Sequence, residues 1–233
     1  MTGQDISDRI VARIDDSVSA PASCTAAEVL AAINEGQQFA ALLTLFLEKT
    51  ITFQIPAASP WFTTRSTVND LFVPLKLTVG GTRIRPATLA ELDALDTGWQ
   101  ASVGPPANYA AIGCNLFAVN PQPAAQTASQ LTYAATPAAI AAGTTPQLPE
   151  AYHQSLVAYG KYRVRLKEGA QSLSRGLGDL NEFLDDMQKL GDFVRARSRA
   201  ARYDMEPFEL QRFDRARLIE EIVKSQAKKK AGA

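Results

Sequence analysis

Hydrophobic positions follow a helical period at both ends of the chain and alternate with polar positions in the middle. Isoleucines spaced four residues apart, beginning at Ile6, predict a short N-terminal helix because that spacing places them on one side of a helix. A second helix is predicted from about Ala26 to Glu48. Thr25 stands three residues before Glu28, the spacing of a capping box in which each side chain satisfies an N–H group of the first turn.

After Lys49 the pattern changes to short alternations, which predict β-strands. In the first of them, Ile51, Phe53 and Ile55 share one face. Gly80-Gly81 predicts a tight hairpin turn, because glycine accepts the positive φ that such a turn requires. Further strands are predicted at Leu71 to Val79, Thr82 to Ile84, Tyr109 to Ile112, Leu116 to Val119 and Gln130 to Ala134.

Three more helices are predicted downstream. Thr88 to Leu95 forms one or two turns that begin with a capping box. Pro149 suits the first position of a helix that ends before Gly169. The next helix is the most regular in the chain, and its apolar residues follow one another at the spacing of a narrow packing seam. The seam consists of Leu173, Leu177, Leu180, Leu184, Met187, Leu190 and Val194.

These elements predict an α+β protein: a helical bundle with an inserted small antiparallel β sandwich or barrel and an extended C-terminal arm. Residues 1–48 supply the N-terminal helices of the bundle, and residues 148–201 supply its C-terminal helices. Residues 49–147 form the β-rich insertion. Residues 202–233 form the arm, which includes a terminal amphipathic segment.

Charge is unevenly distributed although the chain of 233 residues has a net charge of zero. The segment from Arg195 onward carries eleven basic and six acidic residues, so a mildly acidic body ends in a basic tail. Neutrality argues against a general nucleic-acid coat and against a membrane-surface protein. The absence of a long apolar window predicts no membrane span. Cys24 and Cys114 lie too far apart in the sequence to indicate a disulfide framework.

Few residues suggest catalysis. His153 is the only histidine, so a metal site or a triad would have to recruit distant residues, and we expect this side chain to be structural or interfacial. No cofactor, metal site or catalytic residue is predicted. Glu91 and Asp93, close to Trp99, are the best candidates for a pair of acids in a carbohydrate cleft. They define the alternative function, an enzyme that degrades peptidoglycan or polysaccharide.

Beyond Tyr203, large apolar residues occur in a basic, hydrophilic setting and Pro207 interrupts any helix. Such a segment can stack on single-stranded nucleic acid or lie on a membrane as an amphipathic helix. Acidic residues interleaved with the basic ones weaken both interpretations. Folding on a protein partner is therefore favoured.

The order and spacing of several short segments carry a resemblance to a known family. They are Ile51-Thr52-Phe53 after a helix, Phe72 to Lys76, Leu89 to Asp93 with Trp99, Gly104-Pro105 with Tyr109, Leu116 to Pro123, and Leu148 to His153 at the start of a helix. From about Val29 to about Arg199, this order resembles the head-to-tail adaptor (connector) proteins of tailed bacteriophages.

The resemblance implies a structural protein of the virion neck that is made in the host cytoplasm. It implies a ring, usually of twelve copies, that docks under the portal, packs neighbouring subunits through the bundle and directs the β insertion toward a downstream tail or nozzle protein. DNA would pass through the lumen without sequence-specific binding. A tail-side binding module is a further alternative. The C-terminal residues assigned to portal binding are Arg202, Tyr203, Phe208, Leu210, Arg212, Phe213 and Arg215.

Overall fold

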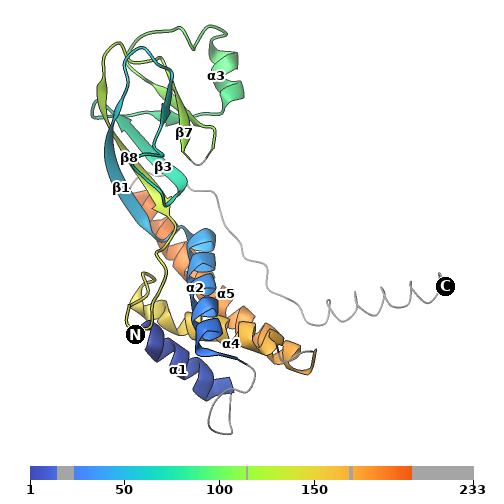
Figure 1. The fold of residues 1–233 in the computed structure, drawn as a ribbon. Helices are drawn as coiled ribbons and strands as arrows, with labels where there is room; N and C mark the ends of the chain where they lie inside the picture. The colour runs from blue at the N-terminus through green and yellow to red at the C-terminus, as the bar shows by residue number, and fades with distance from the viewer. Residues whose placement is uncertain (15–23, 114, 168–169, 201–233) are drawn as a thin grey trace, which may run out of the picture. The chain divides into compact units, whose positions relative to one another are not determined.

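The computed structural model describes residues 1–14, 24–113, 115–167 and 170–200. The chain divides into two compact units (Figure 1). The helical unit contains Met1–Thr44 and Ala138–Ala196, and the β unit contains Leu45–Pro137. Helices and two largely antiparallel sheets make the protein α+β, which confirms the predicted class.

The helical unit begins with α1 (Gly3–Ile14), the predicted N-terminal helix. Ile10 of α1 is fully buried where α1 packs on α4 (His153–Lys167). Gly160 of α4 allows this close approach, because a Cβ there would overlap Ile10 Cδ1 and lie 3.1 Å from its Cγ1. The crossing of α1 and α4 therefore depends on a missing side chain.

Helix α2 (Ala26–Thr44) starts as predicted, but it ends earlier than the expected Glu48. At its start, the Thr25 N–H donates to Glu28 Oε2 over 2.8 Å and the Glu28 N–H donates to Thr25 Oγ1 over 3.3 Å, which confirms the capping box. At its end, Leu45 has a φ of 54°, and this left-handed backbone breaks the helix. Glu48 already belongs to the first strand.

Two polar side chains of α2 hold the irregular segment that returns from the β unit. Gln37, which is buried, donates from Nε2 to the Ala138 carbonyl over 3.0 Å and accepts from the Gln147 N–H over 2.6 Å. Asn34 accepts from the Ile140 N–H over 2.6 Å and donates to the carbonyl of the same residue over 3.0 Å. The amide side chains of α2 thus supply partners to a backbone that has no regular structure of its own.

The C-terminal helices follow a short 3-10 turn, η1 (Glu150–Tyr152). Pro149 is the N-cap residue of this turn, and α4 begins four residues later than the sequence pattern suggested. Helix α5 (Ala170–Ala200) is 31 residues long. Phe39 of α2, Tyr159 of α4 and Phe183 of α5 stack against one another, with ring centroids between 4.9 and 6.0 Å apart. This aromatic cluster joins three helices of the unit.

The β unit has two four-stranded sheets, with strand orders β1-β8-β3-β4 and β2-β7-β6-β5. Figure 1 shows β1, β8 and β3 side by side. The strands are β1 (Glu48–Ile55), β2 (Trp61–Thr63), β3 (Leu71–Val79), β4 (Thr82–Arg83), β5 (Arg85–Pro86), β6 (Asn108–Ala111), β7 (Leu116–Asn120) and β8 (Thr127–Ala135). Four of the six predicted strands agree to within one residue at their ends, whereas β1 and β8 each begin three residues earlier than predicted. The short β2 and β5 were not predicted.

One apolar core lies between the sheets. Leu131 of β8 and Phe117 of β7 are fully buried in it, together with residues of β1, β2, β3 and β6. The rings of Phe53, Phe62 and Phe117 stack in sequence, with centroids 5.4 and 5.2 Å apart. Gly80 and Gly81 have φ values of 55° and 81° at the turn between β3 and β4, which confirms the predicted hairpin.

Candidate functional site

Helix α3 (Leu89–Leu95) carries both carboxylates considered for catalysis, Glu91 and Asp93. Glu91 Oε2 accepts hydrogen bonds from the Thr88 N–H over 2.6 Å and from Thr88 Oγ1 over 3.0 Å. The Glu91 N–H donates in return to Thr88 Oγ1, which completes the predicted capping box. The hydrogen bond from the Thr88 backbone lowers the pKa of Glu91. Through these hydrogen bonds Glu91 caps the first turn of α3.

Asp93 has a different structural partner. Its Oδ1 accepts from Trp99 Nε1 over 2.8 Å, and Trp99 is buried. Trp99 packs in a small second core with Leu92 of α3 and with strand residues of β6 and β7. Its ring also meets Trp61 of β2 edge to face, with centroids 5.4 Å apart. Asp93 therefore satisfies the indole N–H of the side chain that fixes α3 on the sheet.

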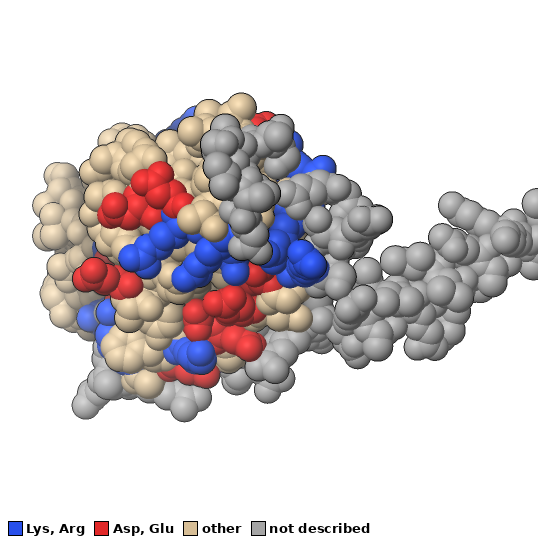
Figure 2. All heavy atoms as spheres, turned by 90° about the horizontal axis from the view of Figure 1, so that it is seen from below, with Lys and Arg blue, Asp and Glu red and all other residues tan. Residues whose placement is uncertain are grey.

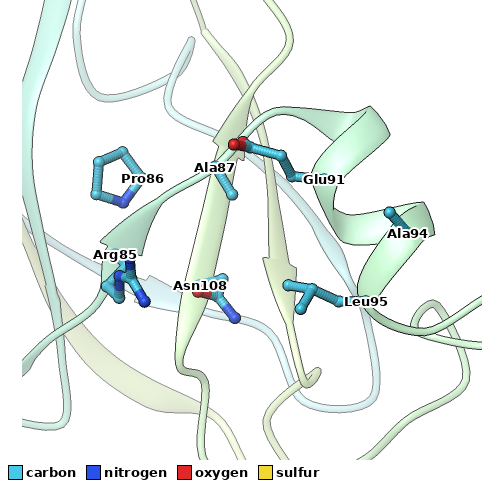
Figure 3. A pocket seen from close by; sticks show the side chains of 7 residues that line it. All are labelled: Arg85, Pro86, Ala87, Glu91, Ala94, Leu95 and Asn108. Atoms are coloured by element: carbon cyan, nitrogen blue, oxygen red, sulfur yellow. The ribbon is translucent and has the colours of Figure 1, made fainter.

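An open groove lies between α3 and the neighbouring strands. It has a volume of about 340 Å³. Figure 3 shows Glu91 and Leu95 extending from α3 toward Ala87, which follows β5, and Asn108 of β6, with Arg85 at the other side. Leu95 is 68% exposed. An open groove with a guanidinium group, an amide and an exposed leucine suits contact with another polypeptide.

His153 has a structural environment, as expected. It is buried, and its Nε2 lies 2.8 Å from the Leu148 carbonyl, where it forms a hydrogen bond. Over the described part of the chain, no three His, Cys, Asp or Glu side chains are grouped in a way that could hold a metal ion. No helix among the described residues is long and apolar enough to cross a membrane.

The sequence analysis missed a ladder of ion pairs along the second half of α4. The basic residues of α4 stand at every second position: Lys161, Arg163, Arg165 and Lys167. Residues four apart lie on the same face of a helix, so Lys161 and Arg165 share one face and Arg163 and Lys167 share another. Lys161 pairs with Asp179 of α5 over 2.6 Å, and Arg165 also pairs with Asp179. This carboxylate is only 8% exposed, and its two cations are 12% and 19% exposed. The alternating basic residues were the available signal, but their partners lie in another helix.

The opposite flank of α4 pairs with α2. Arg163 Nε lies 2.9 Å from Glu35, and Lys167 Nζ lies 2.6 Å from Glu28. The hydrogen bond from Lys167 lowers the pKa of Glu28 to about 2. Burial, followed by the hydrogen bond to Glu35, raises the pKa of Tyr159. Figure 2 shows Lys and Arg side chains lying between groups of Asp and Glu on one face of the molecule.

The predicted seam of α5 faces the inside of the chain. The side chains described for it are buried within the single chain. They are Leu177, Leu180, Leu184, Met187, Leu190 and Val194. The side chain of Leu173 lies outside the described part of the helix.

The residues assigned to portal binding lie outside the described residues. They are Arg202, Tyr203, Phe208, Leu210, Arg212, Phe213 and Arg215. Their assignment stays a prediction.

The carboxylates described above on α2, α3 and α5 thus act as caps, as a hydrogen-bond acceptor for Trp99 and as ion-pair partners. Comparison with known proteins identifies the family. The SU10 adaptor protein family matches residues 1–207, and the chain belongs to this family of phage head-to-tail adaptors. A search of curated proteins found no match. Family membership confirms the resemblance seen in the sequence and makes the chain a structural adaptor of the virion neck that associates with portal and tail proteins.

Proposed function

We propose that twelve copies of this chain form a ring that docks beneath the portal and joins the DNA-filled head to the tail. The observation that carries this proposal is the family match, which covers both the helical unit and the β unit. The structural roles of Glu91 and Asp93 support it against the alternative of a wall-degrading enzyme, because both carboxylates hold α3 in place.

In this proposal the helical unit packs subunits side by side. The α5 seam is buried in its own chain, so it sets the spacing between the helices of one subunit. The contact between neighbouring subunits then uses apolar side chains that are exposed in the single chain. Leu42 of α2 and Phe193 of α5 are 48% and 62% exposed and are the best candidates for this contact. Large apolar side chains left in solvent are typical of surfaces that a partner covers.

The C-terminal segment reaches into the portal in this account. Its aromatic residues Phe208 and Phe213 act as anchors, and its arginines pair with portal carboxylates. DNA passes through the lumen of the ring without sequence-specific contacts. The family match ends at residue 207, so the anchors Phe208 and Phe213 lie beyond the matched residues.

The test is a binding assay between the full chain and its purified portal. We expect Phe208→Ala combined with Phe213→Ala to weaken binding, and we expect a smaller loss from Lys228→Ala, Lys229→Ala and Lys230→Ala together. Binding should also weaken as salt is added, because charge pairs at a surface are screened. A chain truncated after Arg202 that still occupies portals fully would place the portal contact in the helical unit.

A further inference from the structure

The sheet β1-β8-β3-β4 has an outer face that points away from the apolar core (Figure 1). Its inner face carries Ile55, Leu77 and Leu131, which are buried between the sheets. Successive residues of a strand point to opposite faces, so the residues between these form the outer face. The strand pairing arranges the outer residues in rows across the sheet. One row is Thr50, Thr132 and Lys76, and the next is Thr52, Gln130, Thr78 and Arg83.

Exposure changes along this outer face. Ala134 and Thr132 of β8 are 1% and 9% exposed, whereas Gln130 and Ala128 of the same strand are exposed to solvent. The exposed part includes an open depression of about 400 Å³. Its lining comes from three strands and the turn after β3: Thr52, Phe53, Gln54, Thr78, Gly81, Ala128, Ser129 and Gln130.

The end of α5 lies at the buried end of this face. Arg197 belongs to the β unit, and its Nη2 lies 2.6 Å from Glu48 Oε1. Glu48 is the residue of β1 that pairs with Ala134. The chain therefore leaves α5 beside the outer face, with the exposed part still ahead of it.

Charge on the outer face is unbalanced. A polar outer face is usual in an antiparallel sheet. Here Lys76 is partly buried and has no ion pair among the described residues. Arg83 is its diagonal neighbour on the face, because Arg83 lies opposite Thr78. Among the described strand residues of this face, Glu48 is the carboxylate, and it already pairs with Arg197.

The other carboxylates of the described β unit are engaged elsewhere. Each accepts a hydrogen bond from a residue away from Lys76. The pairs are Asp70 with Lys49 and Tyr133, Glu91 with Thr88, Asp93 with Trp99, and Asp96 with the Gly98 N–H. The acid that would balance the outer face must come from another segment or from another molecule.

The sequence after α5 contains such acids. Residues 203–211 include three acidic residues and no basic one. Asp204 and Glu206 are two positions apart, so in an extended chain they lie on the same side, about 7 Å from each other. Diagonal neighbours on a sheet, such as Lys76 and Arg83, are separated by about 7 to 8 Å. The two pairs match in charge and in spacing.

The length of the chain allows the contact. Asp204 is four residues beyond Ala200, the last residue of α5, and four extended residues span about 13 Å. The row of Lys76 lies two residues along β1 from Glu48, a distance of about 7 Å. The same chain reaches this face, so a second copy is not required.

We propose that the segment 204–207 docks on the outer face of its own β unit, with Asp204 and Glu206 paired to Lys76 and Arg83. The contact is a strap that holds the first residues of the C-terminal arm against the sheet. It concerns the single chain, so it stands or fails independently of the proposed portal ring.

Docking sets the point where the arm leaves the body. The family match ends at residue 207, which is also the last residue of the docked segment. Phe208 and Phe213 lie beyond it. The strap therefore positions the arm and leaves these two aromatic side chains available to a partner.

The first test compares amide NMR spectra of the full chain and of two arm variants. Asp204→Asn with Glu206→Gln removes the docking charges. Glu220→Gln with Glu221→Gln is the control, because it removes the same charge further along the arm. We expect the first variant to move the signals of Lys76 and its neighbours on the outer face, and the control to leave them in place. Signals that stay in place in both variants, or move equally in both, would overturn the proposal.

The same spectra distinguish other occupants of the face. Docking within one chain does not depend on concentration, so we expect no movement of these signals on dilution. Signals that shift on dilution toward those of the docking variant would show that a second copy supplies the segment. Signals that ignore both arm variants but move when a short DNA duplex is added would assign the face to phosphate groups. Either result would contradict the proposal.

Proteolysis tests the contact from the side of the sheet. An arginine-specific protease cuts after Arg202, next to the docked segment, and after Arg215, beyond it. Cleavage near a docked segment follows the population in which it has opened. We expect Lys76→Glu to speed cleavage after Arg202 about fivefold, as for the loss of surface ion pairs, and to leave cleavage after Arg215 unchanged.

Arg65→Glu is the matched control for this experiment. It makes the same change of charge in the loop that follows β2, which belongs to the other sheet, and should alter neither rate. Equal cleavage after Arg202 in the unmodified chain and in Lys76→Glu would contradict the proposal. Equal acceleration by Lys76→Glu and Arg65→Glu would do so as well, because it would reflect net charge alone.

Discussion

In the helical unit, basic side chains of α4 pair with carboxylates on α2 and α5, whereas in the β unit the two sheets meet across an apolar core. Ion pairs such as Lys161–Asp179 require particular partners at particular distances. The β core requires volume and shape. The comparison teaches that the helices of this adaptor have a register fixed by charge, while the sheets can present variable loops and edges on a stable interior.

The largest expected effects come from the two cores. Phe183 in the helical unit and Phe117 in the β unit are both fully buried. We expect Phe183→Ala and Phe117→Ala each to lower the free energy of unfolding by about 3 to 5 kcal/mol. Hydrogen exchange should quicken in the unit that carries the substitution. Equal acceleration in both units for either variant would break the comparison, because it would mean that the units unfold together.

The next largest effect concerns Asp179 of α5, the carboxylate that pairs with both Lys161 and Arg165. Asp179→Asn removes the charged partner of Arg165 and leaves Lys161 with only Glu182, 4.0 Å away. We therefore expect a loss of about 3 kcal/mol, measured by chemical unfolding. The matched control is Asp186→Asn. Asp186 pairs with the exposed Lys189, and such surface pairs contribute roughly 0 to 1 kcal/mol. Similar losses in the two variants would show that the buried pair has no special role.

A third effect tests the crossing of α1 and α4. Gly160→Ala should cost about 1 to 3 kcal/mol, because the new Cβ overlaps Ile10. Gly178→Ala is the control within α5: a Cβ there meets nothing within 4 Å among the described residues, so the change should be neutral or stabilise the helix by up to about 1 kcal/mol. Adding Ile10→Val to Gly160→Ala should recover part of the loss. A thermally unchanged Gly160→Ala protein would mean that the helices shift freely.

The smallest effect is a polar contact in the β unit. Asp70 accepts hydrogen bonds from Lys49 over 2.5 Å and from Tyr133 over 3.0 Å. Burial alone would raise the pKa of Asp70, but these hydrogen bonds outweigh it and lower the pKa from 3.8. Burial, followed by the bond to Asp70, raises the pKa of Tyr133 from 10.0 to about 12. We expect Tyr133→Phe to cost about 1 kcal/mol at neutral pH, measured by thermal unfolding.

The pH dependence follows from these directions. A raised tyrosine pKa stabilises the fold fully below pH 10, and this contribution is lost as the pH rises toward 12. The lowered pKa of Asp70 stabilises the fold above pH 3.8, and this contribution is lost as the pH falls through the lower folded value. Tyr133→Phe should remove the alkaline loss that Tyr133 causes. A difference between the two proteins that stays constant from pH 8 to pH 12 would contradict this role.

Local signals predicted local structure well. The capping boxes at Thr25 and Thr88 and the turn at Gly80-Gly81 were readable because each depends on residues within four positions of one another. β2 and β5 were not predicted, because two or three residues cannot show an alternation. The end of α2 was misplaced because nothing in the sequence around Leu45 signals a left-handed backbone.

Contacts between distant segments were beyond the sequence pattern. Gln37 lies among apolar residues of α2, and its partners Ala138 and Gln147 are about a hundred positions away. Asp179 was one of several acids on a helix, and only the fold brings Lys161 and Arg165 to it. The family was predicted because its signature is an order of segments. The portal contacts beyond residue 201 stay a prediction.

The central claim is that this chain is the ring between portal and tail, and electron cryomicroscopy of the full chain mixed with its purified portal tests it most directly. The account predicts a closed ring of twelve copies on the portal, with the C-terminal segments ordered against portal subunits. Portals without added density, or copies of the chain bound singly at other surfaces of the portal, would contradict it.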